Sequence, residues 1–64
     1  MLSFRDATDG QILSAPVAKA IAVQRAMRKG LYEGEVRRII ARLEKDETAR
    51  ETFEEFSAIE VFVR

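Results

Sequence analysis

The segment APVAKAIAVQRAMRK, residues 15–29, limits the possible folds of this chain more than any other. Ser14 before it is a preferred N-cap residue, Pro16 is tolerated in a first helical turn, and Gly30 is a typical C-terminal cap. We therefore predict a helix over residues 15–29. Its apolar residues occupy two sides: Val17, Ala20, Ile21, Val23 and Met27 on one, and Ala18, Ala22 and Ala26 on much of the other.

A helix that is apolar on nearly all sides is usually buried on all sides. The chain has only 64 residues and no cysteine, so burial alone must stabilise it, and little of the chain is left to cover this helix twice. We therefore expect self-association or a protein partner. The predicted contact is a homodimer interface through Ala18, Ala22 and Ala26.

The N-terminal segment MLSFRDATDGQILS is typical of a β-hairpin. Asp9-Gly10 is a favoured pair for a two-residue type I′ turn, because both central positions of that turn need a positive φ. At the other end, residues 58–64 alternate Ile59, Val61 and Val63 with polar neighbours, which predicts a strand. Phe62 interrupts the polar side, which indicates that both sides of this strand are in contact with other residues.

Two further helices are predicted between these segments. The first covers residues 35–45, where Val36, Ile39, Ile40 and Leu43 follow the spacing of an amphipathic helix. The second covers residues 47–57 and is capped either by Asp46 or by a capping box of Thr48 and Glu51.

Together these elements predict a single α+β domain over residues 1–64. Its expected order is β-β-α-α-α-β, with a short antiparallel sheet under three helices. The alternative is a small, mainly α-helical bundle in which the terminal segments are irregular.

The residue types present make catalysis improbable. The chain has no histidine and no cysteine, and none of its three serines stands in a nucleophile-elbow context. We therefore expect neither an enzyme nor a bound metal or cofactor. No apolar run approaches the length of a membrane span, and the first residues do not have the pattern of a secretory leader. With the absence of cysteine, these features favour the cytoplasm and no membrane association.

Charge is unevenly distributed along the chain, although the total is zero. Residues 19–45 carry a net charge of +5 and residues 46–64 a net charge of −4. The basic part resembles a helix-turn-helix in the spacing of Ala26, Gly30, Val36 and Ile39, although Arg25 and Lys29 stand where that motif buries apolar side chains. The side chains that would contact nucleic acid are Arg37, Arg38, Arg42 and Lys45. The alternative is that these four residues form only a solvated helix face.

We predict a non-catalytic binding protein that acts through protein–protein contacts in a regulatory or adaptor role, as a homodimer. Two aromatic residues join the three alanines as candidate interface residues: Phe62, and Tyr32 between Gly30 and Gly34. Tyr32 either lies exposed at a loop tip or fixes the second predicted helix against the core. The alternative function is a small DNA-binding regulator or an antitoxin-like protein. Its charge layout, a basic middle and an acidic end, is similar to that of small bacterial antitoxins.

Overall fold

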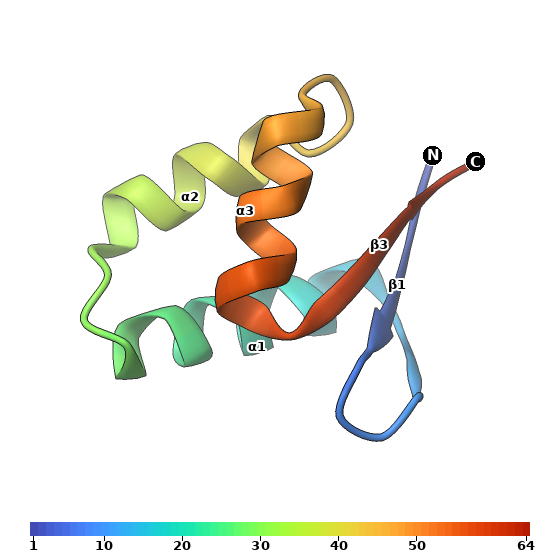
Figure 1. Cartoon of the computed structure of the whole chain (residues 1–64), viewed down its shortest axis with the longest axis horizontal. Helices are drawn as coiled ribbons and strands as arrows, with labels where there is room; N and C mark the ends of the chain where they lie inside the picture. Colours follow the sequence, from blue (N-terminus) through green and yellow to red (C-terminus); the bar gives the residue numbers. More distant parts are fainter.

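A computed structural model describes residues 1–64, and it confirms the α+β class and the predicted order of elements. The alternative of a purely helical bundle is wrong, because both ends of the chain form strands of one sheet (Figure 1). The elements are β1 (Leu2–Asp6), β2 (Ile12–Leu13), α1 (Ala15–Arg28), α2 (Glu33–Ala41), α3 (Glu47–Ser57) and β3 (Ile59–Val63).

The sheet has the strand order β2-β1-β3, with antiparallel pairing throughout. In its register Phe4 lies opposite Leu13 on one side and opposite Val61 on the other. The two termini meet at one end of this sheet (Figure 1), where the Met1 amino group donates to the Arg64 carbonyl at 3.0 Å. The first and last strands of the sequence are therefore direct neighbours.

The hairpin forms, but its predicted two-residue turn is wrong. The Asp6 backbone N–H donates to the Gln11 carbonyl at 2.8 Å, so a wider loop of residues 7–10 joins the strands. Only Gly10 in this loop has a positive φ, of 76°. The Asp9 carboxylate accepts a bond from the Gln11 N–H at 2.9 Å, and Asp6 accepts one from the Thr8 N–H at 3.0 Å. These side-chain bonds stabilise the wider loop.

The ends of α1 follow the predicted signals with one exception. Ser14 is the N-cap residue, but its side chain makes no capping hydrogen bond. At the other end Gly30 takes a φ of 84°, and the Leu31 N–H donates to the Ala26 carbonyl at 3.0 Å. This is the Schellman arrangement, which needs a residue that accepts a left-handed backbone.

The second helix is shorter than predicted, while the third has the predicted bounds. Residues 42–45 leave α2 as successive turns, with the Lys45 N–H bonded to the Arg42 carbonyl at 3.1 Å. Arg50 donates to the Leu43 carbonyl in this turn at 2.8 Å. Of the two predicted caps for α3, Asp46 is the one used, since its carboxylate accepts from the Thr48 N–H at 2.9 Å.

The core lies between the sheet and the three helices. Phe53 is its centre, with ring centroids 6.0 Å from Phe4 and 5.6 Å from Phe56. The alanines predicted to face a second copy, Ala18, Ala22 and Ala26, are instead completely buried in this core. Their small side chains let α1 pack closely against α2, α3 and β1. A partner therefore has no access to them.

None of the helices is both long enough and apolar enough to cross a membrane.

Candidate functional site

The main concave surface is an open groove of about 920 Å³ between α1, the end of α2 and the start of β1. Its floor is apolar, and two facing helices supply most of it. The apolar lining consists of Met1, Leu2, Phe4, Ala15, Pro16, Ala20, Val23, Ile40, Ala41 and Leu43.

The second apolar side of α1 forms one wall of this groove. The alanine side faces the core, while Ala20 is exposed and Val23 is half-buried on the groove side. Ile40 and Ala41 of α2 line the opposite wall. The sequence puts apolar residues on two sides of α1. The chain buries the alanine side completely and covers the other side only in part.

Charged side chains of mainly one sign surround the groove. Lys19 from α1 and Arg37 and Lys45 from α2 and its following turn are basic, while Glu44 is the one acid in the lining. Arg37 is already paired with Glu33 at 3.0 Å, in an exposed bridge one helical turn long. Lys19 and Lys45 take part in none of the three ion pairs of the chain. The rim therefore offers two unpaired cations next to apolar surface.

The structure divides the four basic residues predicted to contact nucleic acid between two surfaces. Arg37 and Lys45 line the groove, whereas Arg38 and Arg42 line a smaller hollow of about 170 Å³ between α2 and α3. A common helix face for these residues requires the predicted continuous helix over residues 35–45. Because α2 ends at Ala41, that geometry does not apply to Lys45.

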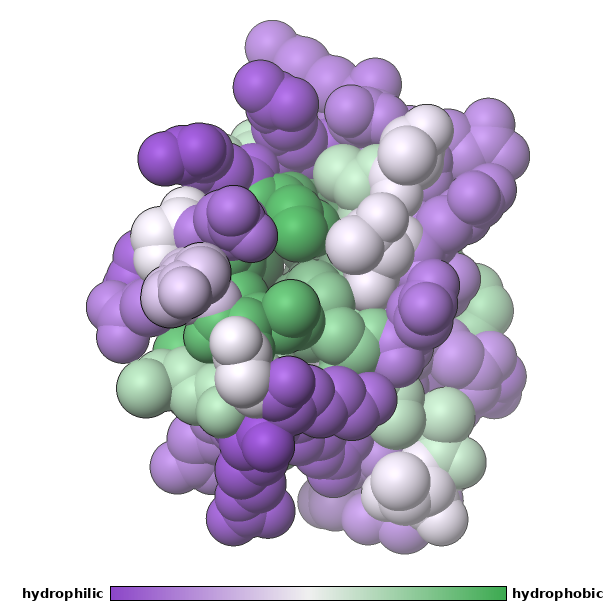
Figure 2. Space-filling model, turned by 60° about the vertical axis from the view of Figure 1, so that its left-hand side comes forward, coloured by the Kyte–Doolittle hydropathy of each residue, from purple (hydrophilic) through white to green (hydrophobic).

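A second apolar surface lies at the connection between α1 and α2. Figure 2 shows hydrophobic residues gathered on the face that holds this connection, with hydrophilic residues around them. Met27, Leu31 and Tyr32 are the exposed large apolar residues of this part of the chain, and we call them the connection patch. Tyr32 is 77% exposed, so its side chain does not hold α2 against the core.

Phe62 lies on the outer face of the sheet, away from both of these surfaces. It is 40% exposed, and the Arg5 guanidinium carbon stands 5.0 Å from the centre of its ring. Arg5 also makes a two-point bond to Glu60, at 3.1 and 3.0 Å. The mutual hydrogen bonds of this pair lower the pKa of the Glu60 carboxyl and raise the pKa of the Arg5 guanidinium. Phe62 therefore already has a cation–π partner within the chain.

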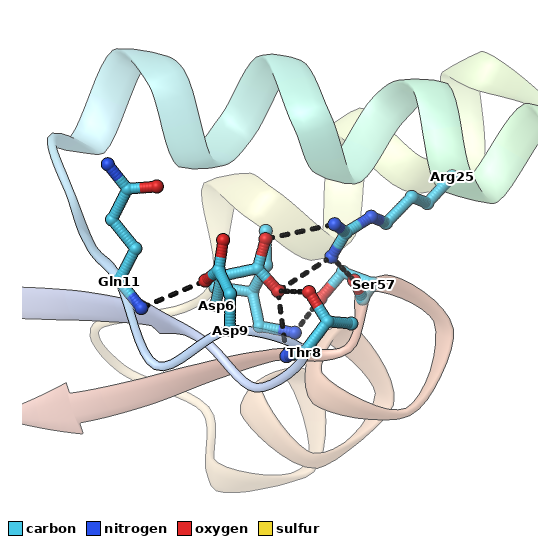
Figure 3. Close-up of polar contacts among 7 residues, drawn as sticks. Asp6, Thr8, Asp9, Gln11, Arg25 and Ser57 are labelled. Carbon is cyan, nitrogen blue, oxygen red and sulfur yellow. Dashed lines mark hydrogen bonds and ion pairs between the residues drawn. The ribbon is translucent and has the colours of Figure 1, made fainter.

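Two basic residues towards the end of α1, Arg25 and Lys29, form hydrogen bonds within the chain. Arg25 donates to the Asp6 carboxylate at 2.9 Å and to the Ser57 carbonyl at 2.7 Å (Figure 3). Bonds from Arg25 and then from Thr8 hold the pKa of the Asp6 carboxyl well below its usual range. Lys29 donates to the Glu55 carbonyl at 3.4 Å. Neither Arg25 nor Lys29 points to a ligand.

Sequence reasoning missed the groove residues Lys19, Ala20, Val23, Ile40 and Ala41. The available signal was that α1 is apolar on two sides. The prediction placed a partner on the side of Ala18, Ala22 and Ala26, whereas the structure leaves the side of Ala20 and Val23 next to the groove. No group of three or more metal-ligating side chains occurs in the structure. No protein-family model matches the chain, and neither a curated protein nor a solved structure is significantly similar to it.

Proposed function

We propose that this chain is a non-catalytic binding protein that acts through contact with another protein, in a regulatory or adaptor role. The observation that carries the proposal is the uncovered apolar groove with its basic rim. An apolar surface surrounded by polar residues typically marks an interaction site. In a chain of 64 residues, leaving Ala20 exposed and Val23 and Ile40 only half-buried gives up apolar burial that the fold could use.

The shape of the groove favours a macromolecular ligand over a small one. Small-molecule sites enclose most of the ligand surface, whereas this groove is open to solvent. The expected homodimer through Ala18, Ala22 and Ala26 is not part of this proposal, since those side chains lie inside the core. The partner is taken to be a different protein.

Site-specific photo-crosslinking in the source cells tests the proposal. A photoreactive amino acid at Ala20 or Ala41, both exposed in the groove, should give an adduct with one discrete protein. The same amino acid at Arg38 is the matched control, because Arg38 is exposed on α2 but does not line the groove. The proposal is wrong if neither groove position gives an adduct that is absent from the control.

DNA binding is the second candidate, and one observation favours it. Arg38 and Arg42 are exposed side by side at the hollow between α2 and α3, and neither belongs to an ion pair of the chain. Phosphate contacts of this kind must weaken steeply as salt rises. A mobility-shift titration with duplex DNA at two salt concentrations, repeated with Arg38→Gln and Arg42→Gln, measures this. The DNA candidate is wrong if the wild type gives no retardation at low salt.

A further inference from the structure

We infer that the groove binds an amphipathic α-helix of a partner protein, with acidic residues along both flanks of the helix. This inference rests on the proposed function and specifies its ligand. Three features carry it: the apolar floor, the walls formed by two helices, and the positive rim.

The floor suits the side of a helix. Ala20 and Val23 on α1 are three residues apart, and Ile40 and Ala41 on α2 follow Arg37 by three and four residues, which are the spacings that align side chains along one side of a helix. The floor combines the small side chains of Ala20 and Ala41 with the branched side chains of Val23 and Ile40. This is the helix-in-groove mode, in which the ligand contributes apolar anchors at positions i, i+3 or i+4, and i+7.

The rim sets the charge of the ligand flanks. Lys19 belongs to one wall, while Arg37 and Lys45 belong to the other, so cations stand on both sides of the floor. Arg37 lies on α2 and Lys45 lies in the turns that follow this helix, so two cations stand at separate points along the same wall. A ligand helix would match them with carboxylates at separate positions on one flank, and would match Lys19 with a carboxylate on the other flank.

A second copy of this chain does not supply such a ligand. Its longest acidic surface is on α3, and the exposed residues of that helix are all polar. They are Glu47, Thr48, Glu51, Thr52 and Glu55. Docking α3 would satisfy the rim but would leave the apolar floor in contact with polar side chains, which is unfavourable. The ligand must therefore carry apolar and acidic residues on the same side, and this points to a different protein.

Two synthetic peptides test the inference on the isotope-labelled full chain by NMR titration. Each has about 16 residues, or roughly 24 Å as a helix, which is shorter than the 28 Å long axis of the molecule. Both have leucines at helical spacing; one carries glutamates on the flanks and the other carries lysines at the same positions. We expect the acidic peptide to shift the amide signals of Ala20 and Ala41, and to bind about tenfold more tightly than its basic twin.

Charge reversal at the rim provides the matched comparison. The double variant Lys19→Glu/Lys45→Glu should weaken binding of the acidic peptide about tenfold and strengthen binding of the basic one. The double variant Arg38→Glu/Arg42→Glu changes the total charge equally, but outside the groove, and should leave both affinities within about twofold. The variant Leu31→Ser removes an anchor of the connection patch and should also leave them unchanged.

Each contrary result has a distinct meaning. Equal binding of both peptides in the groove would overturn the acidic specificity while the proposed function stands. Loss of binding in Leu31→Ser, or shifts confined to the connection patch, would place the ligand elsewhere and overturn the inference. The inference would also be overturned if neither peptide bound. It would be overturned as well if the groove signals shifted with protein concentration alone, because a second copy of the chain would then be the occupant. The crosslinking at Ala20 and Ala41 judges the proposed function independently.

Discussion

Asp6 connects three parts of the fold at the scale of a single residue. It is 5% exposed at the end of β1, bonded to Thr8 in the hairpin loop and to Arg25 on α1. Arg25 extends the connection to the Ser57 carbonyl at the end of α3. A buried carboxylate is tolerated only when it is paired and hydrogen-bonded, and every buried polar side-chain atom of this chain has a partner. The pair therefore orients the hairpin against the helices.

Replacing Asp6 with Asn should destabilise the protein and weaken its response to acid. The folded pKa of Asp6 is lowered from an ordinary value of 3.8, so its contribution to stability is present above that value and is lost as the pH falls below it. At pH 7 we expect Asp6→Asn to lower Tm on the order of 10 °C, because Arg25 loses its ionic partner. Thermal melts followed by circular dichroism should show the Tm difference between the wild type and Asp6→Asn becoming smaller as the pH falls towards about 3. A Tm difference that does not depend on pH would contradict the role of the Asp6–Arg25 ion pair.

Glu60→Gln is the control for this prediction, because Glu60 also pairs with an arginine but lies 40% exposed on the outer face of the sheet. Solvent and salt weaken such a bridge. We expect its Tm at pH 7 to stay within about 3 °C of the wild type. An effect as large as that of Asp6→Asn would show that burial does not distinguish the two pairs.

At the scale of elements, the two apolar sides of α1 have different surroundings. The alanine side packs in the core, where side chains have no space to grow. The side with Ala20 and Val23 borders the groove and is open to solvent. This separation explains why a short helix carries apolar residues nearly all round without being buried all round.

Leucine substitutions on the two sides of α1 test this separation. Ala22→Leu should lower the free energy of unfolding by about 1–3 kcal/mol, because the added atoms overpack a completely buried position. Ala20→Leu makes the same chemical change on the groove side and should stay within about 0.5 kcal/mol of the wild type. Urea unfolding measures both values. Similar losses for the two variants would show that the groove side of α1 is also tightly packed.

The junction of α3 and β3 contains the one non-glycine residue with a left-handed backbone, Ala58 at a φ of 56°. The side chain of an L-residue is strained in this conformation, which glycine adopts freely. We expect Ala58→Gly to raise the free energy of unfolding by about 0.5–1 kcal/mol, since the relief exceeds the added entropy of the unfolded chain. Chemical denaturation gives the value, and a loss of stability would contradict the strain at this junction.

At the scale of the whole molecule, one aromatic cluster joins the sheet to the helices. Phe4 from the first strand, and Phe53 and Phe56 from the last helix, meet although about fifty residues separate them in the chain. Contacts this distant in sequence make the fold depend on both ends of the chain together. The pairing of Met1 with Arg64 continues this connection to the termini.

Phe53→Ala should remove most of the stability of the domain. Truncating a completely buried phenylalanine costs about 3–5 kcal/mol, and small domains have only about 5–15 kcal/mol in total. We expect a flattened near-ultraviolet spectrum or a melt that begins below about 40 °C. Phe62→Ser is the comparison, because Phe62 lies on the outer face, and it should keep a cooperative melt within several degrees of the wild type.

The sequence by itself determined the elements whose signals are local. Gly30 and Asp46 mark helix ends because backbone conformation and capping bonds involve only neighbouring residues, and the alternation of Ile59, Val61 and Val63 likewise predicts β3. Local signals did not determine where α2 ends, because the turn after Ala41 is bonded to Arg50 on the next helix.

The tertiary structure alone decided which side of α1 lies in the core. Both sides are apolar in sequence, and the choice depended on close packing, which favours the small alanines between three neighbouring elements. The same choice left Ala20 and Val23 as a groove wall. Because α2 ends at Ala41, Lys45 lines this groove, whereas Arg42 lines the hollow between α2 and α3. A surface assembled from separate segments depends on how those segments pack, which local patterns of sequence do not specify.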